Sequence, residues 1–341
     1  MQNKIELIKN AGIIGEGGAG FPAYFKLSSK ADIVIANGAE CEPLLYSDQW
    51  IMKNFPERVL KGLFEIKSIT GAKRAVLALK SKYKECILAL KKYNDTYGIE
   101  IFELDNFYPA GDEQTLVYEV SGKIVPEGGI PINVGAIVSN VGTIFNIACA
   151  LEDGSPLIKR VVTVTGEVDN PIVGFVPIGT KISELLKLAS LKLNEFGIID
   201  GGPMMGKLIT EDDVVNKTTS GILVLPLDNP IIKNRSLDIE RELMRDFMVC
   251  CNCSECTLCC PRYQLGHRLK PHQIMQSLIH HKNLEIPNAW LCCECGACEY
   301  ACPMGLSPRH INHYLKDILK KNNIKNSLNF KPEQSEISEI G

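Results

Sequence analysis

The sequence lacks the features of a membrane-spanning or nucleic-acid-binding chain. No apolar run approaches the roughly 18 residues that a bilayer-spanning helix needs, and the first residues do not follow the basic-then-apolar pattern of a signal peptide. The 37 basic residues are outnumbered by 40 acidic ones, and no basic cluster is interleaved with aromatic side chains. We therefore expect a cytoplasmic protein with no direct membrane span and no nucleic-acid partner.

Cysteine is scarce over most of the chain. Only Cys41, Cys86 and Cys149 precede Cys250, whereas the rest of the 14 cysteines lie between Cys250 and Cys302. Because cytosolic thiols are kept reduced, clustered cysteines indicate metal ligands or redox groups rather than disulfides. The metal chemistry is therefore expected in this one C-terminal segment.

The length of 341 residues and the 45% hydrophobic content predict two or three globular domains, each with its own core. In the N-terminal part, apolar strand-like runs alternate with helical periodicity, which is typical of a layered α/β domain with a mostly parallel sheet. Strands are predicted at 31–38, 72–80, 99–104 and 133–140, and helices at 82–93, 112–121 and 142–151.

Turn-forming residues at 152–156 begin a smaller unit of short strands with one helix, which indicates an α+β module. A largely helical region containing the cysteines follows, and the polar tail from Asn322 onward is expected to be disordered. In the module, strands are predicted at 160–168, 172–176, 197–200, 206–210 and 220–225, and a helix at 182–189. In the C-terminal region, helices are predicted at 236–248, 271–281 and 309–321.

The C-terminal cysteines form two C-x2-C-x2-C-x3-C-P motifs. Three cysteines spaced by two residues can wrap a loop around three irons of a 4Fe–4S cluster, and in two-cluster ferredoxins the cysteine before the proline ligates the other cluster. The spacing therefore predicts two clusters with crossed ligands. One set is Cys250, Cys253, Cys256 and Cys302, and the other is Cys292, Cys295, Cys298 and Cys260.

Zinc is the alternative metal, because zinc sites also use C-x2-C pairs. Two consecutive cysteine triplets, each leading to Cys-Pro, fit poorly to two pairs separated by a longer spacer. Cys251, Cys259 and Cys293 fall outside the spacing. We expect them to pack as small residues beside the clusters, and alternate ligation is the rival interpretation.

The segment GIIGEGGAGFP at 12–22 contains five glycines. Their missing side chains let backbone N–H groups approach a flat or anionic ligand closely. Gly15, Gly17 and Gly20 also satisfy the G-x-G-x-x-G pattern of dinucleotide-binding folds, but that pattern should follow a buried strand, whereas the preceding KIELIKNAG has helical periodicity. A flexible structural loop is the third interpretation.

Three polar clusters follow predicted strands: NGAECEP at 37–43, YPAGDE at 108–113 and SNVGT at 139–143. Ligands of α/β sheets bind at the carboxyl ends of strands, so we expect these clusters to converge on one crevice. Asn140 and Thr143, at the start of a predicted helix, would suit a phosphate.

Taken in order with VTVTGEV, GGPMMG and KTTSGILVLP, these segments resemble the RnfC-like family and the flavin-bearing NADH dehydrogenase subunit of respiratory complex I. The resemblance covers nearly the whole chain, and within the family it is similar to the cobalamin reductases of bacterial microcompartments. It implies an FMN- and NADH-binding domain at 1–153, a soluble-ligand-binding β-grasp domain at 154–232, a two-cluster ferredoxin-like domain at 233–323 and the disordered tail at 324–341.

The resemblance also implies the binding residues of the N-terminal domain, and no catalytic side chain, because hydride transfer to a flavin needs no general acid or base. Contacts with FMN are implied for Gly15, Gly17, Gly18, Lys26, Asn37, Asn140 and Thr143. Positions near the flavin or the nicotinamide nucleotide are implied for Glu40, Glu42, Asp112 and Glu113.

The implied activity is that of an NADH:acceptor oxidoreductase. NADH gives two electrons together and a cluster accepts one, so a flavin is needed between them. The implied acceptor is a corrinoid, in a microcompartment and with an adenosyltransferase as a further partner. The alternative is an electron carrier that serves a protein partner, such as an amino-acid reductase or a ferredoxin, without using NADH itself.

Overall fold

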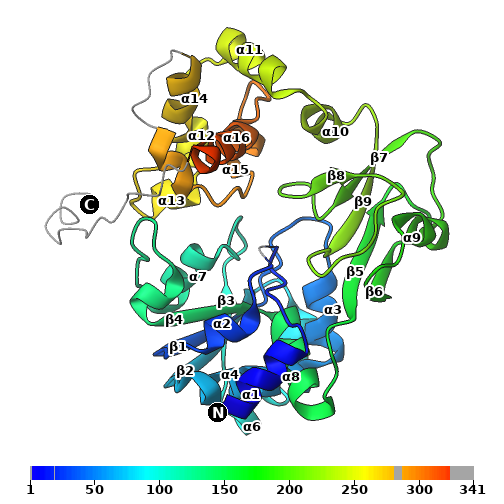
Figure 1. The fold of residues 1–341 in the computed structure, drawn as a ribbon, viewed down its shortest axis with the longest axis vertical. Helices are drawn as coiled ribbons and strands as arrows, with labels where there is room; N and C mark the ends of the chain where they lie inside the picture. Colours follow the sequence, from blue (N-terminus) through cyan, green and yellow to red (C-terminus); the bar gives the residue numbers. More distant parts are fainter. Residues whose placement is uncertain (1, 19, 280–285, 323–341) are drawn as a thin grey trace, which may run out of the picture. The chain divides into compact units, whose positions relative to one another are not determined.

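The computed structural model describes residues 2–18, 20–279 and 286–322 (Figure 1). It divides into two compact units: Met1–Ser121 with Gly135–Leu237, and Gly122–Val134 with Asp238–Gly341. The first unit contains both sheets and the second contains the cysteine motifs. The tail predicted at 324–341 lies outside the described residues, as do the last two residues of the helix predicted at 271–281.

The first sheet has four parallel strands in the order β3-β2-β1-β4. Its central strands are short apolar runs buried on both faces, as expected where helices cover a parallel sheet. This confirms the predicted α/β core. The strands are β1 (Ile33–Asn37), β2 (Arg74–Lys80), β3 (Glu100–Leu104) and β4 (Ala136–Asn140).

Helices cover both faces of this sheet. The helices α4 and α8 pack together and against the central strands, and α7 covers the other side (Figure 1). The α4 helix was not predicted, although Pro56 stands in its first turn and Gly71 ends it in the left-handed region. The helices of this part are α1 (Gln2–Asn10), α2 (Ala23–Leu27), α3 (Ser47–Asn54), α4 (Pro56–Thr70), α5 (Lys84–Leu90), α6 (Asn94–Tyr97), α7 (Glu113–Ser121) and α8 (Val141–Asp153), with a 3-10 turn at Pro131–Val134 in the second unit.

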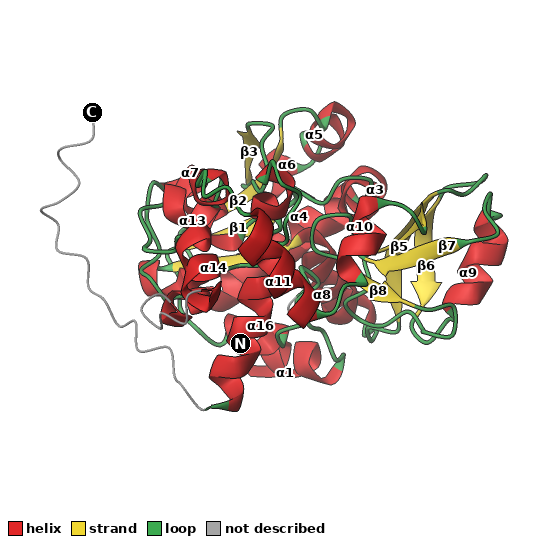
Figure 2. Cartoon of the chain, turned by 90° about the horizontal axis from the view of Figure 1, so that it is seen from above, coloured by secondary structure: helices red, strands yellow, loops and turns green. Residues whose placement is uncertain are grey.

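The second sheet has the order β6-β5-β9-β7-β8, with β5 and β9 parallel and the other neighbours antiparallel. In chain order, two strands are followed by one helix and then by three more strands. This is the topology of a β-grasp fold, as expected. Figure 2 shows that helix, α9, on the outer side of the sheet. The elements are β5 (Lys159–Gly166), β6 (Ile172–Pro177), α9 (Ile182–Ala189), β7 (Phe196–Asp200), β8 (Lys207–Ile209), β9 (Gly221–Pro226) and the following helix α10 (Pro230–Arg235).

The second unit is helical and packs around an apolar core that includes Leu269, Ile311 and Leu315. Residues 122–134 join this unit, where the Val125 carbonyl lies 3.0 Å from Nε2 of His267. No described helix of the chain has the length and apolar character needed to cross a membrane. The helices are α11 (Ile239–Val249), α12 (Glu255–Leu258), α13 (Pro261–Gln264), α14 (Pro271–Ile279), α15 (Ala297–Ala301) and α16 (Pro308–Lys321), with a 3-10 turn at Ile286–Leu291.

Candidate functional site

The strand order of the first sheet contains a topological switch point. From β1 the chain moves outward to β2 and β3 and then returns to the other side of β1 as β4. Asn37 and Asn140 are the last residues of β1 and β4, and they are register partners. Ligands of such sheets bind beside the carboxyl ends of the strands at this point. The two asparagines therefore mark the candidate site.

The glycine-rich segment lies at this edge of the sheet. A Cβ atom on Gly17 would come within 3.9 Å of the Asn140 Cβ, and the Gly15 N–H donates to the Phe21 carbonyl at 2.7 Å, which closes the loop. Gly18 and Gly20 have φ angles of 102° and 64°, in the left-handed region that glycine adopts without strain. A Cβ atom on Gly18 would meet nothing within 4 Å outside its chain neighbours, and Gly18 is exposed, so a ligand can approach the backbone there.

The N-terminus of α8 is built by side chains of the SNVGT segment. Asn140 caps the helix by accepting the Gly142 N–H at 2.8 Å, and its amide donates to Oδ2 of Asp48 at 2.7 Å. The Thr143 hydroxyl accepts the Glu16 N–H at 2.9 Å. Asn140 and Thr143 therefore lie at the helix start, as expected, and they also fix the glycine loop against it.

The end of β1 is tied to the YPAGDE segment. The Asn37 amide donates to the Gly111 carbonyl at 2.7 Å, and the Gly111 N–H donates to the thiol sulfur of Cys41 at 2.8 Å. Asp112 accepts the N–H and the hydroxyl of Thr115 at 3.0 and 3.1 Å, which caps α7. Two of the three polar clusters thus meet at β1, as predicted from their positions after strands.

Lys26 and Glu113 form the charged part of this edge. Their side chains are paired at 2.7 Å and partly exposed, and the Lys26 amino group also donates to the Val138 carbonyl of β4 at 3.3 Å. Lys26 is thus held beside the strand that ends at Asn140. A partly exposed cation at the mouth of the site suits an anionic ligand.

The acidic residues of the NGAECEP segment have different surroundings. Glu40 accepts the N–H groups of Asp48 and Gln49 at 2.9 and 3.2 Å, and burial raises the pKa of both Glu40 and Asp48. Glu42 instead accepts the Met204 and Met205 N–H groups, at 3.0 and 2.6 Å. It therefore holds the GGPMMG loop of the β-grasp module.

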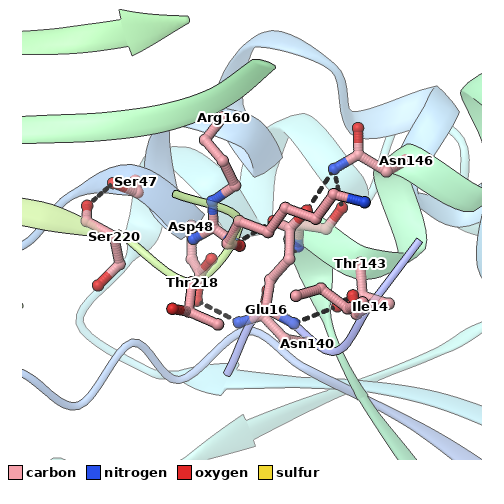
Figure 3. A network of polar contacts seen from close by, with 12 residues as sticks. Ile14, Glu16, Ser47, Asp48, Asn140, Thr143, Asn146, Arg160, Thr218 and Ser220 are labelled. Atoms are coloured by element: carbon pink, nitrogen blue, oxygen red, sulfur yellow. Dashed lines mark hydrogen bonds and ion pairs between the residues drawn. The ribbon is translucent and has the colours of Figure 1, made fainter. Parts of the chain in front are cut away.

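A buried ion pair at the glycine loop was missed by sequence reasoning. Arg160 of β5 lies 2.9 Å from Oε2 of Glu16, with only 4% of either side chain exposed, and the Asn146 amide donates to Oε1 of Glu16 at 2.5 Å (Figure 3). Burial raises the pKa of Glu16, and the Arg160 charge and the Asn146 hydrogen bond oppose that shift. The sequence contains one indication of this ion pair, which is that Glu16 is a charged residue within a run of glycines.

The residues at this edge fit FMN. The loop offers backbone N–H groups to a phosphate or a flat ring, Lys26 offers a cation, and α8 presents its N-terminus nearby. The side chains of Asn37, Asn140 and Thr143 already have protein partners, so they shape the loops more than they offer free donors.

The two cysteine motifs share one backbone conformation. Asn252 and Ser254 of the first motif have φ angles of 57° and 65°, and the matching Glu294 and Gly296 of the second have 58° and 81°. A short helix follows each loop, α12 or α15. These left-handed residues between the cysteines curve both loops in the same way. Such curvature suits a loop whose thiolates surround a cluster.

The fourth cysteine of one motif lies with the first three of the other. Cys250, Cys253, Cys256 and Cys302 line one cavity, together with side chains that include His272 and Met304. Burial, followed by the nearby Cys259 and Cys302, raises the pKa of Cys256 to about 12. The donor set fits a 4Fe–4S cluster.

The second set shows the same arrangement. Burial raises the pKa of Cys292 to about 12, with the neighbouring Cys293 and then Cys260 adding to the shift and Lys316 opposing it. Burial also raises the pKa of Cys298 well above its usual range, with Cys292 and Cys260 again close by. Cys260 thus lies among the second set of thiols.

Comparison with known proteins agrees with these features. Residues 8–149 match the Nuo51 FMN-binding domain, and residues 249–307 match a 4Fe-4S dicluster domain. The cobalamin reductase PduS of Salmonella typhimurium is 41% identical over 93% of this chain and 72% of its own length. The chain belongs to the RnfC-like family. Its cofactors are FMN and two 4Fe–4S clusters, and it is an oxidoreductase that transfers electrons.

Other relatives are longer than the matched region. A subunit of the proton-translocating ferredoxin:NAD(+) oxidoreductase complex of Clostridium ljungdahlii is 35% identical over 77% of this chain, and the match spans 56% of that subunit. The crystal structure of an NAD+-reducing [NiFe]-hydrogenase in the H2-reduced state has a TM-score of 0.61 at 17% identity, over 98% of this chain and 63% of the other. That likeness confirms the fold.

Proposed function

We propose that this RnfC-like protein takes electrons from NADH and delivers them through FMN and two 4Fe–4S clusters to a corrinoid. The observation that carries this proposal is the 41% identity with a cobalamin reductase over 93% of the chain. Bound FMN would accept two electrons from NADH and release them one at a time to the clusters.

The FMN site is proposed at the carboxyl ends of β1 and β4. The backbone of Gly15, Gly17 and Gly18 would line the ligand, and Lys26 would attract its phosphate. Asn37, Asn140 and Thr143 would hold the three surrounding loops in register. Support comes from the convergence of these segments at the switch point and from the open backbone of Gly18. Glu40, Glu42, Asp112 and Glu113 would shape the loops around the flavin and the nicotinamide nucleotide.

The clusters are proposed to have crossed ligands. Supporting observations are the cavity shared by Cys302 and the first motif, and the position of Cys260 among the second set of thiols. The proposed sets are Cys250, Cys253, Cys256 and Cys302 for one cluster, and Cys292, Cys295, Cys298 and Cys260 for the other.

A second candidate function is delivery of electrons to a protein partner. The 35% identity with the subunit of the ferredoxin:NAD(+) oxidoreductase complex favours it. In that case the flavin and cluster sites would be the same, and the acceptor would be an iron–sulfur protein or a reductase in place of a corrinoid.

An anaerobic titration tests both. The chain is reconstituted with FMN, iron and sulfide, NADH is added, and the flavin and cluster absorbances are followed before and after hydroxocobalamin is supplied. We expect bleaching by NADH and its reversal by the corrinoid. The Cys256→Ser variant is expected to keep flavin bleaching and lose corrinoid reduction. Absence of bleaching would contradict NADH as the donor, and bleaching without corrinoid reduction would favour the protein acceptor.

We further propose a cytoplasmic location within a microcompartment, an adenosyltransferase as partner, and the domain boundaries 1–153, 154–232 and 233–323. The relationship to the cobalamin reductase PduS motivates the location and the partner. The matched ranges 8–149 and 249–307 lie within the first and third proposed domains. Co-elution of the purified chain with a corrinoid adenosyltransferase during gel filtration tests the partner, and separate migration of the two would contradict it.

A further inference from the structure

Two segments of the β-grasp module reach the glycine-rich loop. Arg160, on β5, pairs with Glu16, and its Nη1 also donates to the Lys217 carbonyl at 3.0 Å. The Lys217 amino group donates to the Gly12 carbonyl at 2.6 Å. The loop is therefore held at both Gly12 and Glu16 by residues that follow it by more than 140 positions.

The ion pair between Glu16 and Arg160 restricts the conformation of the glycine-rich loop, because the pair forms only when the loop places Glu16 beside Arg160. Glu16 and Arg160 are both buried, and an isolated charge at either position would lack solvation. The Glu16 carboxylate packs against Gly142, where a Cβ atom would come within 2.4 Å of Oε2, and its backbone N–H binds Thr143. Glu16 thus joins β5 to the first turn of α8.

These contacts are separate from those that join the module to the remainder of the unit. The Ser47 hydroxyl lies 3.0 Å from the Thr163 hydroxyl and donates to the Ser220 carbonyl at 2.8 Å, with both Ser47 and Thr163 buried. Thr163 shares strand β5 with Arg160, and its hydroxyl instead accepts the Tyr46 N–H at 3.0 Å and bonds Ser47, outside the glycine loop. Substitutions that break the contacts of the glycine loop therefore leave this second group of bonds in place.

We propose that Arg160 and Lys217 are positioning residues through which the β-grasp module fixes the glycine-rich loop in its flavin-binding shape. Flavin affinity and flavin potential then depend on the module, although no module residue is needed to touch the flavin. This inference rests on the proposed FMN site, and it adds a role for the β-grasp module in that site.

The test compares Arg160→Met, Glu16→Gln and Lys217→Met with the wild-type holoprotein. FMN binding to the deflavinated protein is measured by fluorescence quenching, and the flavin midpoint potential by anaerobic spectroelectrochemistry. Arg160→Met and Glu16→Gln are expected to bind FMN about ten- to a hundredfold more weakly, as when one member of a buried charge pair is removed, and to shift the potential. Lys217→Met, which loses the hydrogen bond of a charged donor to the Gly12 carbonyl, is expected to bind FMN about tenfold more weakly. Iron content and the cluster EPR spectrum are expected to stay unchanged.

Thr163→Val is the matched control, because it breaks a buried contact of the same strand away from the loop. It is expected to lower the unfolding temperature and to leave FMN affinity within about twofold of wild type, as for a site outside the network. Equal FMN affinity in all variants, or an equal loss in Thr163→Val, would overturn the inference. Wild-type protein that binds no FMN would instead refute the proposed flavin site. If Arg160→Met fails to fold, the half-buried Lys217 still decides the question.

Discussion

At the scale of single residues, the candidate flavin site contains more carboxyl groups than cations. Glu16 has Arg160 as its partner, whereas Asp48 has a neutral partner, the amide of Asn140. Burial, followed by the charge of Glu40, raises the pKa of Asp48 well above 3.8. The folded protein therefore binds a proton at Asp48 more tightly than the unfolded chain does.

The raised pKa of Asp48 makes the free energy of unfolding depend on pH. The stabilising contribution of a group whose pKa is raised by folding is complete below its unfolded value and is lost as the pH rises through its folded value. Asp48→Asn keeps the shape and removes the charge. We expect it to raise the free energy of unfolding on the order of 1 kcal/mol at pH 8 and by less at pH 5.

Urea unfolding of the two proteins at both pH values measures this difference. The exposed Asp212 provides a control, because Asp212→Asn should change stability little at either pH. A larger gain at pH 5 than at pH 8 would show that the sign is wrong.

The left-handed backbone position in each cysteine loop leads to a second prediction about single residues. Ser254 occupies the left-handed position that Gly296 occupies in the other motif. A non-glycine residue there costs about 1–2 kcal/mol, partly offset by the lower chain entropy of serine. Ser254→Gly is expected to stabilise the reconstituted protein by about 0.5–1 kcal/mol, and Gly296→Val to reduce cluster incorporation.

Thermal unfolding and iron analysis of the reconstituted proteins check both changes. Ser28→Gly is the control, because Ser28 has a φ angle of −74° and gains nothing from left-handed freedom. Similar stabilisation by the two glycine substitutions would argue against the conformational explanation.

At the scale of elements, periodicity and turn residues predicted most of the strands and helices. The helix at 182–189 was predicted with its observed bounds, because its apolar spacing is regular and turns flank it. The α4 helix was missed although Val59, Leu60 and Leu63 follow helical spacing after Pro56. The helix α4 packs against α8 where Gly62 meets Ile144, which lies 82 positions later in the sequence. The sequence around Gly62 does not indicate this packing partner.

That crossing depends on Gly62. A Cβ atom at this position would come within 2.4 Å of the Ile144 carbonyl oxygen, so the two helix backbones touch. Helix propensity alone favours alanine over glycine by about 1 kcal/mol. We expect the steric cost to dominate, with Gly62→Ala lowering the free energy of unfolding by about 1–3 kcal/mol.

Chemical denaturation measures the free energy of unfolding of Gly62→Ala and of the control variant Ser68→Ala, each against the wild-type protein. Ser68 is exposed on the same helix, so its replacement by alanine should be neutral or slightly stabilising. Equal stabilisation by both substitutions would mean that α4 and α8 are not packed this closely.

At the scale of the whole molecule, the sequence could not reveal which distant segments meet. The glycine segment, the strand ends and the cysteine spacing were visible as motifs, and they predicted where ligands would gather. The Arg160–Glu16 pair and the Glu42 contact with the GGPMMG loop join residues more than 140 positions apart. Nothing in either local sequence specifies such a partner, because folding topology alone brings them together.

The crossing of the cluster ligands is a prediction at this scale, and paired substitutions test it. If Cys302 serves the first motif, Cys250→Ser with Cys302→Ser removes two ligands of one cluster, and about four irons should remain. Cys292→Ser with Cys302→Ser then removes one ligand from each cluster, and both should be lost or weakened.

Uncrossed ligands reverse these two results, because Cys292 and Cys302 would then serve the same cluster. Iron analysis and the EPR spectrum of the reduced protein read out each case, with the matching pairs at Cys260 as a repeat from the other motif. Crossing ties the two motifs into one folding unit, since each cluster then needs both loops. Loss of one cluster should therefore also loosen the loop that binds the other, and proteolysis of the single Cys302→Ser variant should cut both loops faster than in the wild-type protein.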